Sequence, residues 1–400
     1  MELIPAGSQY RTPVFERELS PPLEAQESYF VVTPEEERAF QAIVHDDKKL
    51  KDLISLLPKA ELHNHLEGAV RPSTVLEIAK RDGIPIPEST VEEVAKATSM
   101  QPGDDLLVFL QKIRTYAFVF DKKEDISRVT YETVEDAARQ NVKYLELRFN
   151  PLKQKEKYVT VEEFIESALA GARKAEEDLG VKTRLIVSIN RSYPVEAAWR
   201  VARAAIKYED EGVVGMDLAA DEINYPPELF ADVFKFAREN GVHVTIHAGE
   251  AAGPESVRKA IELCGAERIG HGVRSQEDPS LEAILAERKI PLELCPTSNL
   301  QTGAVPSLGS YPLKHYLNLG IPVTLNTDDS QIFLTTLNDE YAKMARSGLS
   351  LSELLQVDAH GLNVAFLPES EKRELRPEFL QGFRNVLQAV HHYGLKPLNP

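Results

Sequence analysis

The sequence predicts a (β/α)8 TIM barrel. Two observations carry this prediction: short, apolar strand candidates alternate with segments of helical spacing, and the alternation occurs eight times. The chain of 400 residues is long enough for a barrel of about 250 residues with added elements. The strand candidates are residues 60–63, 143–149, 183–189, 213–218, 242–247, 268–270, 291–294 and 322–326.

The N-terminal part of the chain does not follow the alternation. Residues 1–57 are predicted to form an arm and a helix, and residues 58–400 the barrel domain. The helix begins at a Thr33 cap with Glu36 three residues later, which is the pattern of a capping box, and it is predicted to run to about Leu57.

Two further departures from a minimal barrel are predicted. The connection between the first and second strands is long for one crossover, so we interpret it as a helical insertion that could form a lid. Helical patterns after Leu349 extend the chain past the eighth strand. The helical patterns of the insertion are residues 73–81, 104–120 and 124–140.

Composition excludes several classes of protein. The formal net charge of -17 argues against a protein that binds the phosphate backbone of nucleic acids. Cys264 and Cys295 lie in apolar segments, which predicts two buried, reduced thiols and not a disulfide framework. The N-terminus has no apolar signal region, and no apolar run reaches membrane-spanning length. These features predict a cytoplasmic protein that acts on neither nucleic acid nor membrane.

Titratable residues follow several of the strand candidates. The carboxyl ends of the strands in a barrel meet at one rim, where the chemistry of barrel enzymes is found. His63 and His65 are two residues apart, so both face one side of an extended strand. The residues expected at this rim are His63, His65, Asp217, His247, Glu250, His271, Asp328 and Asp329.

Three imidazoles and a carboxylate at one rim suit a divalent cation with four protein ligands and an open water position. Zinc fits best, although iron, cobalt or manganese could occupy the same ligands. Each signal alone has a simpler explanation. A His-x-His pair is usually incidental, two adjacent Asp residues often form a turn or a helix cap, and His271 before Gly272 could bond to the backbone. Their joint occurrence at strand ends favours the metal site.

Other conspicuous side chains are interpreted as residues without a role in a functional site. Tyr311, His315 and Tyr316 are more typical of surface or core positions than of a site. The pair His391-His392 resembles a chance metal-binding pair, and its place near the C-terminus separates it from the rim.

The motifs carry a resemblance to a known family. In order along the chain they are HNHLEG (63–68), MDLAADE (216–222), HAGE (247–250), HG (271–272) and TLNTDD (324–329). Together they resemble the adenosine deaminase family of the metal-dependent amidohydrolase superfamily. The segment CPTSNLQTG (295–303) is similar to the bacterial-type members. The likeness extends from about residue 58 to about residue 375.

The resemblance implies an activity and a set of roles. It implies hydrolytic deamination of adenosine and 2′-deoxyadenosine to inosine and 2′-deoxyinosine plus ammonia, by attack of a zinc-bound water on purine C6. One zinc ion is expected, because the fourth strand ends in Asp217-Leu218-Ala219 without the lysine common in binuclear relatives. The implied metal ligands are His63, His65, His247 and Asp328.

The remaining roles follow from the same resemblance. Protonated Glu250 would face purine N1, while His271 and Asp328 would orient the zinc-bound water and accept its proton. The implied substrate contacts are Asp329 with N7, the backbone N–H of Ala220 with N3, and Glu67 with the ribose 5′-hydroxyl. The chemistry agrees with this assignment, because attack at C6 of an aromatic purine requires a neutral carboxylic acid at the ring nitrogen.

The sequence departs from the family pattern at three positions. Ala220 stands where glycine is usual, and alanine is strained there if the position needs a positive φ. Ser330 follows the Asp pair where proline is common, and Glu67 is one methylene longer than the aspartate of vertebrate-type enzymes. These departures leave open the same chemistry on adenine, 6-aminodeoxyfutalosine or methylthioadenosine. A third hypothesis is a silent nucleoside-binding or partner-binding protein that uses its N-terminal arm.

Overall fold

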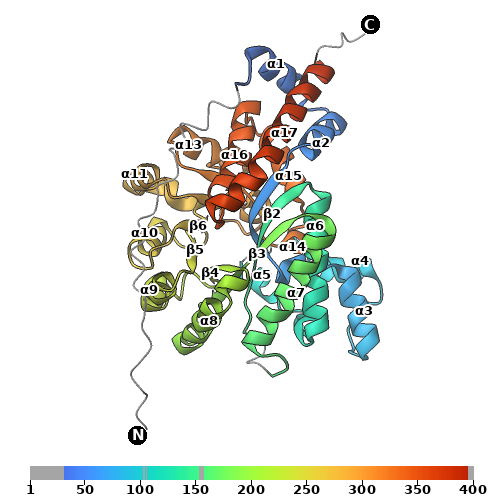
Figure 1. The fold of residues 1–400 in the computed structure, drawn as a ribbon, viewed down its shortest axis with the longest axis vertical. Coiled ribbons are helices and arrows are strands. Elements are labelled where there is room, and N and C mark those ends of the chain that lie inside the picture. The colour runs from blue at the N-terminus through green and yellow to red at the C-terminus, as the bar shows by residue number, and fades with distance from the viewer. Residues whose placement is uncertain (1–30, 102–103, 105, 153–156, 395–400) are drawn as a thin grey trace. The chain divides into compact units, whose positions relative to one another are not determined.

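The protein is seen in a computed structural model that describes residues 31–101, 104, 106–152 and 157–394. Eight parallel strands follow one another in the order β1 to β8, with helices around them (Figure 1). The predicted barrel is therefore confirmed, and each predicted strand is present with ends that differ by at most two residues. The strands are β1 (Lys59–His65), β2 (Val142–Phe149), β3 (Lys182–Asn190), β4 (Val213–Ala219), β5 (His243–Ala248), β6 (Arg268–His271), β7 (Leu292–Leu294) and β8 (Val323–Leu325).

The strands are buried along almost their whole length, as expected where helices cover the outside and side chains fill the inside. In β3, Leu185, Ile186 and Val187 are successive residues that are all fully buried. β-branched and leucine side chains suit both faces of such a strand, which explains why the strand candidates appear as continuous apolar runs.

The barrel closes between β8 and β1 at the carboxyl ends of the strands. The backbone N–H of Asp328 donates to the carbonyl of His63 at 3.0 Å, and the N–H of His65 donates to the carbonyl of Asp328 at 2.8 Å. Closure of the barrel therefore fixes His63 and His65 beside Asp328, although these residues lie at opposite ends of the domain sequence.

One helix of the barrel ring follows each strand. These helices are α6 (Lys123–Arg139), α7 (Val161–Leu179), α8 (Val195–Lys207), α9 (Ala231–Glu239), α10 (Pro254–Glu262), α11 (Pro279–Arg288), α13 (Leu313–Asn318) and α16 (Leu351–Asn363). Further helical elements lie in the loops: η6 (Glu209–Glu211), η7 (Pro227–Phe230), η8 (Val273–Glu277), α12 (Pro296–Gln301), η9 (Leu308–Ser310), α14 (Ser330–Phe333) and α15 (Leu337–Arg346).

The predicted single helix from Pro34 to about Leu57 is wrong, because the segment forms α1 (Pro34–Ile43) and α2 (Asp47–Ser55). The Asp46 side chain accepts a hydrogen bond from the backbone of Lys49 at 3.1 Å, which starts a second helix. The predicted Thr33–Glu36 capping box is confirmed. The domain boundary near residue 57 stays a prediction.

The last helix of the described residues is α17 (Glu369–Gly394), which packs against α1 (Figure 1). His391 Nε2 lies 3.0 Å from Glu36 Oε1 at this contact, so this histidine joins two helices away from the strand ends. The predicted C-terminal helical extension is confirmed.

The insertion after β1 is shorter than predicted. It comprises η3 (Glu67–Ala69), α3 (Pro72–Asp82), α4 (Val91–Thr98), α5 (Leu106–Lys112) and η4 (Ala117–Phe120). The helical pattern at 124–140 is α6, which packs on α7 as part of the barrel ring. The pattern at 104–120 forms only α5 and η4, and α4 was missed.

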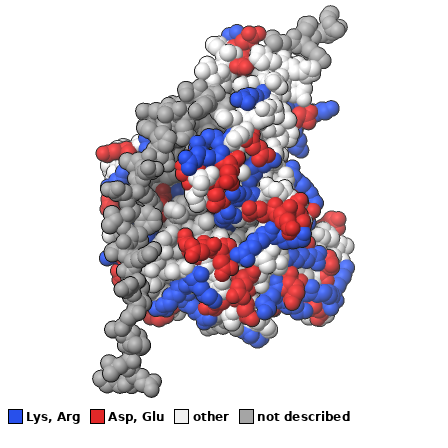
Figure 2. Space-filling model, viewed as in Figure 1, with Lys and Arg blue, Asp and Glu red and all other residues white. Residues whose placement is uncertain are grey.

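Acidic and basic side chains are interspersed over the face drawn in Figure 2. Many of them form ion pairs, such as Arg71 with Asp136 at 2.6 Å and Arg128 with Glu132 at 2.8 Å. Among the described residues, none of the helices combines the length and the apolar character needed to cross a membrane.

Candidate active site and metal centre

The four predicted metal ligands meet at the carboxyl ends of the strands. The Nε2 atoms of His63 and His65 lie 3.2 Å and 3.4 Å from Asp328 Oδ1. The Nε2 atoms of His65 and His247 are 3.2 Å apart. One ligand atom from each of the four residues lies within 4.8 Å of the others, so the structure brings together side chains from β1, β5 and the end of β8.

The donor atoms fit a cation. Nδ1 of His63 lies 2.9 Å from Glu293 Oε2, and Nδ1 of His247 lies 2.9 Å from Asp217 Oδ1. A carboxylate accepts a proton from each Nδ1, so the Nε2 lone pairs of both rings point inward. His63 Nε2 is buried and makes no hydrogen bond to any described residue. Lone pairs and a carboxylate that converge in this way repel each other unless a positive ion lies between them.

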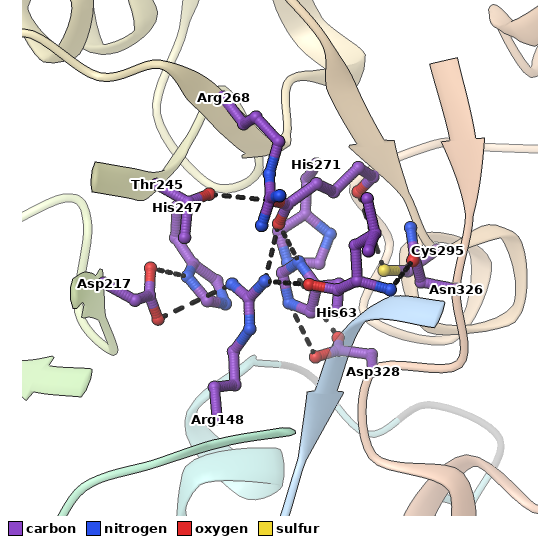
Figure 3. Close-up of polar contacts among 12 residues, drawn as sticks. His63, Arg148, Asp217, Thr245, His247, Arg268, His271, Cys295, Asn326 and Asp328 are labelled. Atoms are coloured by element: carbon purple, nitrogen blue, oxygen red, sulfur yellow. Dashed lines mark hydrogen bonds and ion pairs between the residues drawn. The ribbon is translucent and has the colours of Figure 1, made fainter. Parts of the chain in front are cut away.

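A buried ionic network holds the carboxylates that orient these rings (Figure 3). Arg148 Nη2 lies 2.7 Å from Glu293 Oε2, and its Nη1 lies 3.7 Å from Asp217 Oδ2. Arg268 Nε lies 2.7 Å from Glu293 Oε1 and pairs on its other side with Glu146. Burial opposes ionisation of Glu293, but the two guanidinium charges outweigh it and hold its pKa well below the usual range.

Sequence reasoning missed Glu293, Arg148, Arg268 and Glu146. A signal was present, because Glu146 and Arg148 alternate in a strand candidate and both face the barrel interior. A charge in a buried strand needs a partner. The partner strand, however, could not be read from the sequence.

Glu250 lies beside the ligand group without belonging to it. Its Oε2 is 3.6 Å from His271 Nε2, and its side chain is 13% exposed. Burial, together with the charges of Asp328 and Glu222, raises the pKa of Glu250 well above its usual range. These surroundings therefore favour the neutral, proton-donating form of the Glu250 carboxyl group.

The loop that carries Glu250 is organised by Glu222. The Glu222 carboxylate accepts hydrogen bonds from the backbone N–H groups of Gly249 at 2.6 Å, Ala251 at 2.8 Å and Ala252 at 2.9 Å. A buried acid after β4 therefore shapes the turn after β5, which positions the neutral acid of the site.

Asp328 and Asp329 are adjacent but differ in their surroundings. Burial opposes ionisation of Asp328, yet its close contact with His63 and the other nearby imidazoles hold its pKa well below the usual range. Burial and the charges of Asp328 and Glu67 raise the pKa of Asp329 well above it. A methyl group on Gly68 would lie 2.0 Å from Asp329 Oδ1, so glycine is needed at position 68 to admit this carboxyl group.

Three site residues have strained backbones. Ala220, His271 and Asp328 have φ angles of 80°, 63° and 64°, each at or just after the end of a strand. Side chains other than glycine rarely adopt such angles, and strained residues of this kind cluster at functional sites. The expectation that Ala220 is strained if its position needs a positive φ is thereby met.

A cavity of about 370 Å³ opens above the ligand group. Seven further predicted residues line it together with His65: Glu67, Ala220, His247, Glu250, His271, Asp328 and Asp329. Phe109, Leu110, Ile113 and Phe120 from the insertion form an apolar wall. Glu67 Oε1 accepts a hydrogen bond from the backbone of Asn150 at 2.9 Å. The size and the lining suit a small, flat molecule with a few polar groups.

Two side chains of the segment after β7 (residues 295–303) contact site residues. The sequence assigned no role to either of them. Ser298 Oγ donates to Asp328 Oδ2 at 2.7 Å, and the Asn299 amide lies 3.0 Å from His271 Nδ1. Tyr311, which the sequence placed in the surface or core, is buried and donates to Asn299 Oδ1 at 2.9 Å. His315 instead pairs with Glu282 at 2.6 Å, outside the cavity.

Comparison with known proteins agrees with the fold and the motifs. Residues 58–381 match the model of the adenosine deaminase family. Adenosine deaminase of Klebsiella pneumoniae (strain 342) is 41% identical over 333 residues, which cover 82% of this chain and 99% of that enzyme. Two solved structures are also similar. Adenine deaminase from Arthrobacter aurescens has a TM-score of 0.77 and 28% identity, covering 82% of this chain and 99% of its own.

The second structure is an amidohydrolase from Burkhoderia ambifaria with bound zinc, with a TM-score of 0.78 and 27% identity over 86% of this chain and 94% of its own. The family match spans more than half of the chain, and the relative from Klebsiella is similar over nearly its full length. The chain therefore belongs to the adenosine deaminase family.

Proposed function

We propose that the protein hydrolyses adenosine and 2′-deoxyadenosine to inosine and 2′-deoxyinosine plus ammonia. The observation that carries the proposal is the proximity of two unlike groups at the bottom of one cavity. A ligand set of three imidazoles and a carboxylate adjoins Glu250, a carboxylic acid that burial keeps neutral. Hydrolysis at C6 of a purine needs both an activated water and a proton donor.

His63, His65, His247 and Asp328 would hold one divalent cation, and zinc is the ion we propose. When bound, it would supply the Lewis acidity that lowers the pKa of a water molecule from 15.7 towards about 7. The zinc bound in the similar amidohydrolase from Burkhoderia ambifaria supports this choice of metal. The Asp217 and Glu293 carboxylates would keep the two buried rings in the tautomer that a metal requires.

The other side chains would bind the purine and move protons. Glu250 would donate its proton to N1 as the new bond forms at C6, and Asp328 would accept a proton from the attacking water. Asp329, kept neutral by burial, would donate to N7. The Ala220 backbone N–H would meet N3, and Glu67 would bind the 5′-hydroxyl of the sugar.

A substrate panel tests the proposal. Ammonia release is measured with zinc-loaded protein on adenosine, 2′-deoxyadenosine, adenine, methylthioadenosine and 6-aminodeoxyfutalosine, with chelator-treated protein as the control. Fast turnover of adenosine is expected. The similarity to an adenine deaminase makes adenine the main competitor, and turnover of adenine alone would move the substrate while keeping the chemistry. Binding of zinc and adenosine without ammonia release would indicate a silent binding protein.

The proton donor is tested by Glu250→Gln. The amide keeps the shape of the side chain but cannot deliver the proton, so kcat is expected to fall by about 10³-fold while zinc content stays unchanged. The control is Glu255→Gln on the following helix, where the side chain is 69% exposed and wild-type kcat is expected. An active Glu250→Gln variant would refute the assigned role.

A further inference from the structure

Asn299 and Tyr311 form a chain of hydrogen bonds behind His271. Asn299 is fully buried in α12, directly after β7, and its amide lies 3.0 Å from His271 Nδ1. Tyr311 approaches the same amide from the other side, with its hydroxyl 2.9 Å from Oδ1. Neither residue lines the cavity, so both act on the site only through the imidazole ring.

The direction of this chain follows from the Tyr311 hydroxyl. A phenol has a single proton, and the Tyr311 hydroxyl donates it to Asn299 Oδ1. The carbonyl oxygen of the Asn299 amide therefore faces Tyr311. The NH2 group of Asn299 must therefore face His271.

An amide donor at Nδ1 determines which nitrogen of His271 carries the proton. Nδ1 must accept, and a neutral imidazole has one N–H, so that proton lies on Nε2. An imidazolium would place an N–H against the amide N–H, which excludes it in this arrangement. His271 Nε2 lies 3.6 Å from Glu250 Oε2 and 3.9 Å from Asp328 Oδ2, on the side where the reaction takes place.

The neighbouring histidines have the opposite arrangement. Carboxylates of Glu293 and Asp217 accept from Nδ1 of His63 and His247, which leaves the Nε2 lone pairs free. One cavity thus contains imidazoles of both tautomers. The chemical type of the group behind each ring, carboxylate or amide, separates the metal ligands from the ring that donates a hydrogen bond.

We propose that Asn299, held by Tyr311, is a positioning residue that fixes His271 as an Nε2–H donor, so that Asp328 alone accepts the proton of the attacking water. This inference rests on the proposed function, and it divides the role shared by His271 and Asp328 in the family resemblance. The Nε2–H group of His271 orients the oxygen atom of the nucleophile without taking its proton.

The protons balance under this division. The water oxygen bonds to C6, one water proton goes to Asp328, and Glu250 protonates N1. The proton on Asp328 is passed to the 6-amino group, the C6–N bond breaks, and ammonia leaves. The remaining hydroxyl proton returns to Glu250 as the C6 carbonyl forms. No step requires a free lone pair on His271.

The tautomer can be measured without substrate. We would label the ten histidines with ¹⁵N and distinguish protonated from unprotonated ring nitrogens by NMR on the zinc-loaded protein, assigning His271 by its loss in His271→Gln. We expect Nε2 of His271 to be protonated in the wild type. In Asn299→Asp a carboxylate replaces the amide, and the proton should move to Nδ1. A wild-type ring protonated on Nδ1 would overturn the inference.

Kinetics then test whether the tautomer matters. Asn299→Asp is expected to lower kcat by about 10²-fold with KM changed less than threefold, the loss typical of one misdirected hydrogen-bond donor. Tyr311→Phe frees the amide to rotate and should lower kcat about 10-fold, and it provides a second variant if Asn299→Asp does not fold. Asn318→Asp on the exposed end of α13 is the matched control.

The two proposals fail in different ways. If no aminopurine is turned over, the proposed function fails, while the NMR experiment still decides the state of His271. If adenosine is turned over and a variant with the moved proton keeps the wild-type kcat, the proposed function stands and the role of Asn299 is refuted.

Discussion

The two ends of the barrel differ in whether their buried polar atoms have hydrogen-bond partners. At the amino end of β1, the Lys59 Nζ atom donates to the backbone carbonyls of Ile54, Leu57 and Gln140 at 2.9, 2.7 and 2.9 Å. At the carboxyl end of β1, His63 Nε2 faces other lone pairs and has no hydrogen-bond partner in the described part of the chain. The first arrangement is complete by itself, and the second is completed only by a ligand.

Residues with positive φ angles also differ between the two ends of the barrel. Asn141 and Lys289 have positive φ angles directly after α6 and α11, where helices commonly end in this conformation. Ala220, His271 and Asp328 have them at the ends of strands that carry the site. The amino end of the barrel therefore stabilises the fold, whereas strained residues and unpaired polar atoms lie at the carboxyl end, which carries the site. Four predictions test this difference.

Lys59→Met should have the largest effect. Methionine fills the same space but leaves three buried carbonyls without a donor, so the free energy of unfolding should fall by about 3 kcal/mol. kcat of the folded protein should not change, because the lysine is remote from the cavity. Chemical denaturation and a kinetic assay measure both, with exposed Lys51→Met as the control. A large loss of kcat would contradict the separation of the two ends.

Asp217→Asn should weaken metal binding. Asp217 is fully buried and accepts the Nδ1 proton of His247, and an amide there supports the ring less well than a carboxylate. Zinc affinity, measured by competition with a chromophoric chelator, should fall about 10- to 100-fold. Asp358→Asn removes an equally buried carboxylate, whose charge interacts with Lys59 at the amino end of the barrel. This variant should keep the zinc affinity of the wild type. Equal losses of zinc affinity in Asp217→Asn and Asp358→Asn would contradict the difference between the two ends of the barrel.

His360 should make the amino end sensitive to acid. Burial lowers the pKa of this histidine, which contacts the backbone of Val323, from 6.5 to about 4. Between these values the unfolded chain binds a proton that the folded chain does not, so stability falls as the pH falls from 6.5 towards 4. From pH 7 to pH 5 the wild type should lose about 2 kcal/mol more than His360→Gln.

Urea denaturation at several pH values measures this difference, and exposed His45→Gln serves as its control. The His360 prediction is wrong if the wild type and His360→Gln lose stability in parallel.

Ala220→Gly should have the smallest effect and the opposite sign. Glycine adopts a φ of 80° without strain, so the metal-loaded variant should be more stable by about 1 kcal/mol. KM should also change, because the Ala220 methyl group lines the cavity. Ala219→Gly, one residue earlier in β4, should instead destabilise by about 0.5–1 kcal/mol. Thermal unfolding of both variants decides whether the strain at position 220 is real.

Sequence reasoning predicted local features well and connections poorly. The eight strands and the capping box at Thr33 follow from side-chain period and hydrogen-bonding residues that are close in the sequence. The break between α1 and α2 was not predicted, because the helix was expected to continue from Pro34 to about Leu57. The helix α6 was assigned to the insertion because its periodicity does not tell which neighbour it packs against.

The sequence by itself determined which residues stand at the carboxyl ends of the strands. Strand period and direction are local properties, so His63, His65, His247 and Asp328 could be assigned to one rim from the sequence alone. Only the tertiary structure decided what each group does there. Glu293 lies 230 residues from His63 and fixes its tautomer, and the pKa of Glu250 depends on burial and on charges from other strands. Protonation follows from distances between remote parts of the chain, and folding alone sets those distances.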